Sequence, residues 1–181
     1  MSRRVARPYA AALFQVMERQ GLAVLREVEG QLGTVAEVFA REPELVRVFE
    51  VPSVTVAAKR ALLEAIGTAC GLRVETRRML AALAQHVRLR YLAEVAAAFR
   101  ELVDRKEGVV RGRLELAVEP VPAQVAAVSD ALQRVFAARV ELEAERREEL
   151  LAGFVVRVGS RVLDGSLRSQ VERFAAAAAK E

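Results

Sequence analysis

The stretch GFVVRVGSRVLDGSLRSQVERF, residues 153–174, decides how the C-terminal part of this chain folds. Its first residues alternate as a β-strand with one inward face requires, and Gly159 with its neighbour predicts a tight turn into a second strand. The triplet Asp164, Gly165 and Ser166 predicts another break, where Asp164 or Ser166 accepts an unpaired amide of a closing helix. None of these residues is arranged for catalysis, so we interpret the hairpin and helix as a binding platform.

The segments that precede this hairpin complete a small α+β domain. From Val109 the apolar period changes to two and stays so until Pro120, which predicts a strand. Residues 123–138 return to helical spacing, and residues 140–145 alternate again as a second strand. The order strand, helix, strand, hairpin, helix predicts an α+β domain with few strands over residues 107–181.

The N-terminal part has helical periodicity throughout, and the fold class expected for the whole chain is mainly α. Apolar residues recur every three or four positions, and Gly or Pro punctuates the segments. We expect Pro8 in or near the first turn of the first helix, and Gly30 and Gly33 to permit close helix approach. The pattern predicts a six-helix bundle over residues 1–106, with helices near residues 5–17, 22–41, 43–52, 54–65, 74–86 and 89–103.

The C-terminal motif R-x-G-S-x-V-x-D-G-S-x-R at residues 157–168, together with ARPYAAALF at residues 6–14, resembles the delta subunit of F-type ATP synthases. The mitochondrial member of this family is the oligomycin sensitivity conferral protein. The resemblance extends over essentially the whole chain. This chain departs from the usual family pattern at Arg146 and Arg147, where an apolar residue and then an acid or amide are usual. It also has Ser160 where the family usually has Asp.

The resemblance implies a non-catalytic stator subunit without a cofactor, present in one copy per complex. Its N-terminal domain is expected to bind the N-terminal tails of the alpha subunits, and its C-terminal domain the b subunits of the peripheral stalk. Proton-driven rotation is thereby coupled to ATP synthesis. We expect a peripheral location at the cytoplasmic face of a bacterial cell membrane, with membrane association only through the complex.

Two sets of residues are candidates for these contacts. A groove between the first and fifth helices is expected to receive an alpha tail in the helix-in-groove mode, although Tyr9 also fits a role as bundle core. Its candidate residues are Tyr9, Leu13, Met79 and Ala82. The C-terminal domain is expected to expose apolar side chains that it cannot cover alone, and the b-subunit candidates are Val155, Val162 and Leu167. Gly159, Asp164, Gly165 and Ser166 are expected to shape turns and caps.

The net charge of the chain is compatible with a second hypothesis about its function. The 181 residues have a net charge of +4. Residues 1–106 contain 17 Lys or Arg against 12 acids, and residues 107–181 contain 11 against 12. A basic helical bundle is compatible with a small RNA-binding, antitermination-like factor. Against it stand the few aromatic residues for base stacking and the interleaving of Arg with Glu. We therefore expect no nucleic-acid partner.

The sequence lacks the motifs that are typical of phosphate-binding loops and of metal sites with two histidines. No glycine-rich phosphate loop occurs, and His86 is the only histidine, so sites that need two imidazoles are excluded. Glu141, Glu143 and Glu145 share one strand face, which we interpret as solvated. Cys70 is the only cysteine and is interpreted as core filler. The Arg-rich N-terminus has the composition of a transit peptide, but because it contains the first helix we interpret it as mature protein.

Overall fold

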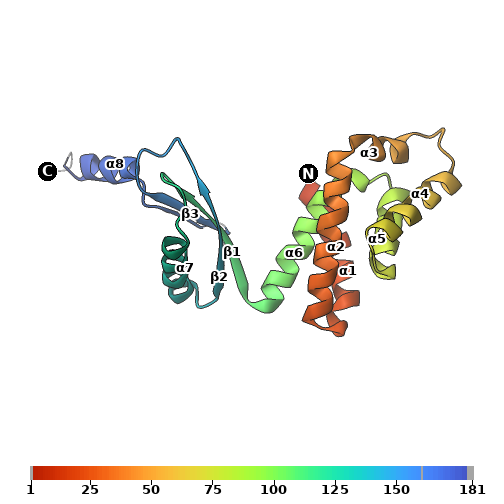
Figure 1. The fold of residues 1–181 in the computed structure, drawn as a ribbon, viewed down its shortest axis with the longest axis horizontal. Coiled ribbons are helices and arrows are strands. Elements are labelled where there is room, and N and C mark those ends of the chain that lie inside the picture. The colour runs from red at the N-terminus through yellow and green to blue at the C-terminus, as the bar shows by residue number, and fades with distance from the viewer. Residues whose placement is uncertain (1, 160, 179–181) are drawn as a thin grey trace. The chain divides into compact units, whose positions relative to one another are not determined.

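The computed structural model describes residues 2–159 and 161–178 of the chain. The chain divides into two compact units, Met1–Val103 and Asp104–Glu181. The described residues are mainly helical, and a small four-stranded sheet occurs only in the second unit, which confirms the expected mainly α class (Figure 1). Each unit is described below by itself.

The first unit is built from helices around one apolar core. The core contains side chains from each of its α-helices, including Leu25, Phe49, Leu80 and Phe99, and Phe14 meets Phe99 edge to face. Two short 3-10 helices, Glu18–Gln20 and Leu89–Tyr91, accompany the α-helices. The α-helices are α1 Ser2–Met17, α2 Leu22–Arg41, α3 Pro43–Glu50, α4 Val56–Ala69, α5 Val74–Gln85 and α6 Leu92–Glu107.

Helix α2 shows how the apolar period selects the core face. Its buried side chains follow the helical period, at Leu25, Val28, Leu32, Val35 and Phe39. The two glycines of α2 lie off this face. A Cβ at either one would meet nothing within 4 Å, so the expectation that these glycines allow a close helix approach is wrong.

Helix α1 begins earlier than its apolar period suggests. It starts at Ser2 and therefore holds Pro8 in its interior, not in its first turn as expected. Proline has no N–H to donate, so one intrahelical hydrogen bond is missing there. Thr55, by contrast, caps α4 as sequence rules suggest, because its hydroxyl accepts a hydrogen bond of 3.2 Å from the N–H of Ala58.

The second unit is a mixed sheet with helices α7 Pro122–Phe136 and α8 Leu167–Ala178. The strands are β1 Val109–Leu116, β2 Arg139–Arg146, β3 Phe154–Val158 and β4 Arg161–Asp164, in the order β2-β1-β3-β4. β1 runs parallel to β2 through the α7 crossover and antiparallel to β3. The first strand in the sequence is thus an interior strand of the sheet, and helix α7 packs on β2 (Figure 1).

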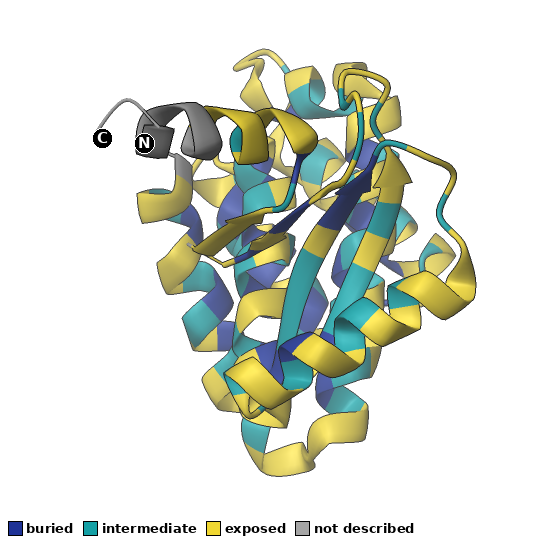
Figure 2. Ribbon diagram, turned by 90° about the vertical axis from the view of Figure 1, so that its left-hand side faces the viewer, coloured by how far each residue is buried: buried dark blue, intermediate teal, exposed yellow. Residues whose placement is uncertain are grey.

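The two faces of this sheet differ in polarity. The face toward α7 carries the apolar core of the unit, with Leu114, Val140, Val156 and Val158 packed with Leu132 of the helix. Figure 2 shows buried and half-buried residues along most of β1, whereas β4 is exposed, and exposed residues over the outer sides of the helices. The opposite face carries charged side chains of β1 and β2, which form ion pairs between Arg111 and Glu141 at 3.0 Å and between Arg113 and Glu145 at 3.7 Å. Glu141 is half-buried and Glu143 and Glu145 are exposed, which fits the expected solvated strand face.

Candidate interaction surfaces

The hairpin and the helix after it form as the sequence predicts. β3 and β4 pair antiparallel, and Gly159 leaves β3 with φ +58°, in the left-handed region that favours glycine. The other turn residue, Ser160, lies outside the described residues. Ser166 is buried and its hydroxyl accepts the N–H of Ser169 at 3.3 Å, so it caps α8. Asp164 accepts the N–H of Ser166 at 2.9 Å and the hydroxyl of Ser169 at 2.7 Å.

Close packing forces the remaining residues of this corner to be small. A Cβ at Gly153, where φ is +91°, would lie 2.4 Å from the carbonyl oxygen of Gly165. A Cβ at Gly165 would press on the ring of Phe154 at 3.0 Å. The structure therefore explains both glycines by contact.

A hollow of about 770 Å³ lies between the hairpin, helix α8 and residues 147–152. All three b-subunit candidates line it, and Val162 and Leu167 expose 52% and 47% of their surface there. Val155 is 95% buried, however, so the expectation that it contributes exposed apolar surface is wrong. β3 buries residues on both of its faces, Val155 on one and Val156 on the other, which is why alternation alone misassigned Val155. Leu151, which is 86% exposed, and Val171 supply apolar surface that the sequence analysis missed.

Two arginines that line this hollow, Arg147 and Arg157, hold a nearly buried carboxylate between them. Glu115 of β1 has a side chain that is only 7% exposed, and it accepts hydrogen bonds from Arg147 at 2.6 Å and Arg157 at 3.2 Å. The hydrogen bond from Arg147 is the main reason that the pKa of Glu115 lies below its usual range. Arg147 also binds Glu149 at 2.8 Å. Arg147 departs from the usual family pattern, and its contacts with Glu115 and Glu149 explain it here. Arg146, the other departure, forms an exposed ion pair with Glu119 at 3.4 Å.

A second apolar hollow, of about 590 Å³, lies on the other face of the same hairpin, next to α7. The floor is Phe154, Val156 and Leu163, and Ala127 and Ala131 of α7 form one wall. Phe154 and Leu163 are 38% and 44% exposed. Helix α7 therefore leaves the β3–β4 half of this face open.

In the first unit, the two helices named for the alpha-tail groove do pack against each other. Tyr9 and Ala82 are half-buried, whereas Leu13 and Met79 belong to the core. The exposed apolar residues of α1 that share a face with Tyr9 are Ala12 and Val16, and Val16 is 58% exposed. Their spacing of three and seven residues from Tyr9 is a signal that sequence reasoning could have used. We call Tyr9, Ala12, Val16 and Ala82 the α1/α5 strip.

One end of the α1/α5 strip is closed by the turn after α5. The N–H of Arg88 bonds to the carbonyl of Leu83 at 2.7 Å and that of Val87 to Ala84 at 3.1 Å, which is the Schellman pattern. Val87 occupies the left-handed position of this motif with φ +55°, where glycine is usual. The turn directs Arg88 to the hydroxyl of Tyr9 at 3.0 Å, with its guanidinium 5.9 Å from the ring centre.

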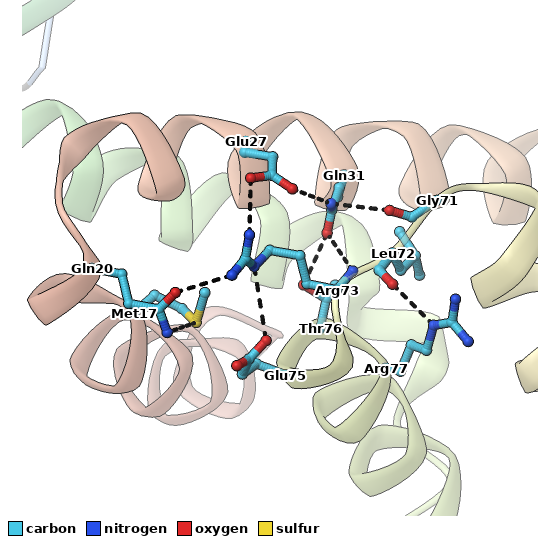
Figure 3. A network of polar contacts seen from close by, with 10 residues as sticks. All are labelled: Met17, Gln20, Glu27, Gln31, Gly71, Leu72, Arg73, Glu75, Thr76 and Arg77. Atoms are coloured by element: carbon cyan, nitrogen blue, oxygen red, sulfur yellow. Dashed lines mark hydrogen bonds and ion pairs between the residues drawn. The ribbon is translucent and has the colours of Figure 1, made fainter.

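The other end of α5 is held to α2 by a polar network (Figure 3). Gln31 of α2 accepts hydrogen bonds from the N–H of Arg73 at 3.0 Å and from the hydroxyl of Thr76 at 3.2 Å, and it donates to the carbonyl of Gly71 at 3.1 Å. The Arg73 side chain reaches Glu27 at 3.1 Å. Because Thr76 is completely buried, this network fixes where α5 starts. It therefore sets the position of the α1/α5 strip.

The described residues show no grouping of three or more His, Cys, Asp or Glu side chains that could hold a metal ion. His86 is exposed at the end of α5, and Cys70, interpreted from the sequence as core filler, is half-buried against the core. Among the described helices, none combines the length and the apolar character that crossing a bilayer requires.

Comparison with known proteins gives a consistent result along the chain. The family model for ATP synthase delta (OSCP) subunit matches residues 5–177. ATP synthase subunit delta of Oleidesulfovibrio alaskensis is 35% identical over 92% of this chain and 91% of its own length. ATP synthase subunit delta 2 of Syntrophotalea carbinolica is 34% identical over 94% of each chain. A chain of the Toxoplasma gondii mitochondrial ATP synthase hexamer superposes with a TM-score of 0.71 at 26% identity, over 97% of this chain and 96% of that one.

Proposed function

We propose, from the premise that this chain belongs to the ATP synthase delta (OSCP) family, that it is the stator link between the catalytic head and the peripheral stalk. The first unit binds the N-terminal tails of the alpha subunits, and the second binds the b subunits. The link works without catalysis, at the cytoplasmic face of a bacterial cell membrane and in one copy per complex. It keeps the head from turning with the rotor, so that proton flow is coupled to ATP synthesis.

The observation that carries this proposal is that each of the two compact units has a partly open apolar surface. The α1/α5 strip lies in the first unit, and the hollow lined by Val162 and Leu167 in the second. A protein that transmits torque needs two separate binding surfaces rather than a reactive centre. Two attachments also raise the effective concentration of each contact, so the assembled link outlasts either contact alone.

Apolar contact dominates the proposed b-subunit surface. Val162, Leu167, Leu151 and Val171 all line the same hollow and are all exposed. Covering apolar surface contributes about 25 cal/mol per Å² before the costs of association are subtracted. An amphipathic helix from a b subunit fits this chemistry, with its apolar face on the hollow.

Point variants of the full-length protein test the two surfaces separately. Truncation at Gly153 is unsuitable because it removes β3, which pairs with the interior strand β1. Val162→Glu should abolish b binding and leave alpha-tail binding unchanged, and Ala12→Glu should do the reverse. Each variant is compared with wild type in pull-downs from native membranes and in ATP synthesis by reconstituted membranes.

The same experiment separates the stator hypothesis from its rival. Recovery of alpha and b subunits with wild-type protein supports the proposal, as does loss of one partner in each variant. Recovery of RNA polymerase or ribosomal RNA instead would support an RNA-binding factor. Retention of b by Val162→Glu would show that b binds elsewhere, for example in the hollow next to α7.

A further inference from the structure

We propose that the α1/α5 strip takes an acidic amphipathic helix, whose carboxylates meet Arg78 and Arg88. The inference rests on the proposed function, in which this strip receives an alpha-subunit tail, and it adds the charge that the tail must carry. The occupant is thus defined by two properties: an apolar face that covers the strip, and acidic side chains beside that face.

The first step is the sign of the charge on the two helices. Helix α1, Ser2–Met17, contains three arginines and no acid. From Thr76 to Ala93, the sequence contains four arginines and again no acid. Glu75, the one acid of α5, lies 3.8 Å from Arg73 and is engaged there. The arginines of α1 lie off the strip, and Arg3 and Arg7 line a hollow with Glu94 and Glu101 of α6. The cationic character beside the strip therefore comes from Arg78 and Arg88, and an anionic partner is complementary to it.

The second step identifies which arginines are available. Arg77 is occupied by Glu64 at 3.2 Å and by the carbonyl of Leu72, and Arg90 lies 3.8 Å from Glu50. Arg78 is exposed and has no ion pair or hydrogen bond within the described part of the chain. Arg88 has Tyr9 as its hydrogen-bond partner. Because a guanidinium has five N–H donors, Arg88 keeps donors for a carboxylate.

The third step is placement along the strip. Arg78 precedes Ala82 by one helical turn, and Arg88 follows the end of α5 beside Tyr9. At 1.5 Å per residue, α5 rises about 10 Å from Arg78 to its last residue, Gln85, and Arg88 follows in the turn that closes the helix. Carboxylates about two turns apart on a bound helix would reach both arginines. The left-handed turn at Val87 holds Arg88 against Tyr9 before any partner arrives, so this contact is preorganised and sets the register of the bound helix.

Two model peptides test the inference with full-length protein. Both carry the same apolar face, and their polar faces carry either Glu or Lys at the same positions. Isothermal titration calorimetry should show about tenfold tighter binding of the Glu peptide, and the difference should shrink at high salt because exposed charges are screened. Arg78→Glu should remove the preference. Arg60→Glu, a matched change of an exposed arginine on α4, should leave it unchanged.

Other results of the same titrations would contradict the inference. Equal affinity for both peptides, no binding of either, or an unchanged preference in Arg78→Glu would overturn the inference, and so would tighter binding of single-stranded RNA than of the Glu peptide. A synthetic alpha-subunit tail is titrated in parallel. If the Glu peptide binds as expected and the tail does not, the inference stands and the assignment to alpha fails. If the tail binds independently of Arg78, the inference fails and the stator proposal stands.

Discussion

Arg147 donates a hydrogen bond of 2.6 Å to Glu115, a carboxylate that is almost completely enclosed on the interior strand β1. Arg157 contacts the other carboxylate oxygen at 3.2 Å. Removing one partner of an enclosed charge pair is costly because the remaining charge loses its compensation. The pair therefore connects residue 147, which follows β2, to the centre of the sheet.

We expect Glu115→Gln to destabilise the second unit at pH 7 and less so in acid. The folded-state pKa of Glu115 lies below its ordinary value, so its contribution is fully present above about pH 4.3, the unfolded pKa. That contribution is lost as pH falls through the lower folded pKa. Urea unfolding followed by circular dichroism should show the gap between variant and wild type narrowing below about pH 4.3. An equal gap at all pH values would contradict the ion-pair explanation.

Gln31→Leu should destabilise the first unit by about 1–3 kcal/mol, because it leaves the buried Thr76 hydroxyl and the N–H of Arg73 without their acceptor. Both tyrosines of the chain, Tyr9 and Tyr91, lie in this unit and there is no tryptophan. Tyrosine fluorescence during urea unfolding therefore reports this unit alone. Gln15→Leu, at an exposed position of α1, is the matched control and should change stability little.

Val87→Gly should stabilise the first unit by about 1 kcal/mol. A β-branched residue at φ +55° is strained, and glycine removes a penalty of about 1–2 kcal/mol at the expense of some unfolded-state entropy. Ala81→Gly, at an exposed interior position of α5, the helix that ends just before Val87, should instead destabilise by about 1 kcal/mol. Thermal unfolding of both variants checks the opposite signs, and destabilisation by both would exclude strain at Val87.

The effect of a glycine-to-alanine substitution on stability should depend on the space around the glycine. Gly30→Ala should stabilise α2 by about 0.5–1 kcal/mol, because its Cβ would enter open space. Gly112→Ala should destabilise the sheet by about 1–3 kcal/mol, because its Cβ would lie 2.7 Å from Val158 and 2.9 Å from Leu142. Urea midpoints read by circular dichroism measure both. A neutral Gly112→Ala would mean that the neighbouring strands yield easily.

Local patterns predicted the elements of this protein, because helices and hairpins are determined by residues close in sequence. The period of α2 and the turn at Gly159 are examples. The same patterns could not show that β1 pairs with both β2 and β3, since the partners of β1 are far away in the chain. Val155 was misassigned because alternation distinguishes the two faces of a strand but does not show that residues on both faces can be buried.

The candidate surfaces were predictable only in part. Sequence reasoning identified the two helices correctly, but as binding candidates it selected Leu13 and Met79, which are buried in the core. The exposed Ala12 and Val16 were overlooked. In a sequence, large apolar side chains are the obvious candidates for a binding surface. Smaller apolar side chains at the edge of the core are the ones that remain accessible to a partner. The contact between Arg88 and Tyr9 joins residues 79 positions apart and depends on a left-handed valine, which no propensity rule favours.

The interior position of β1 has a consequence for biosynthesis. A ribosome releases Val109–Leu116 before either neighbouring strand exists, and β1 keeps two unpaired edges until β2 and β3 have been synthesised. The helices before it rely on more local contacts and can form sooner. During translation the nascent chain thus carries a strand open on both sides, which is the form most prone to pairing with another chain. Ribosome-associated chaperones should accordingly engage this segment in preference to the helical part.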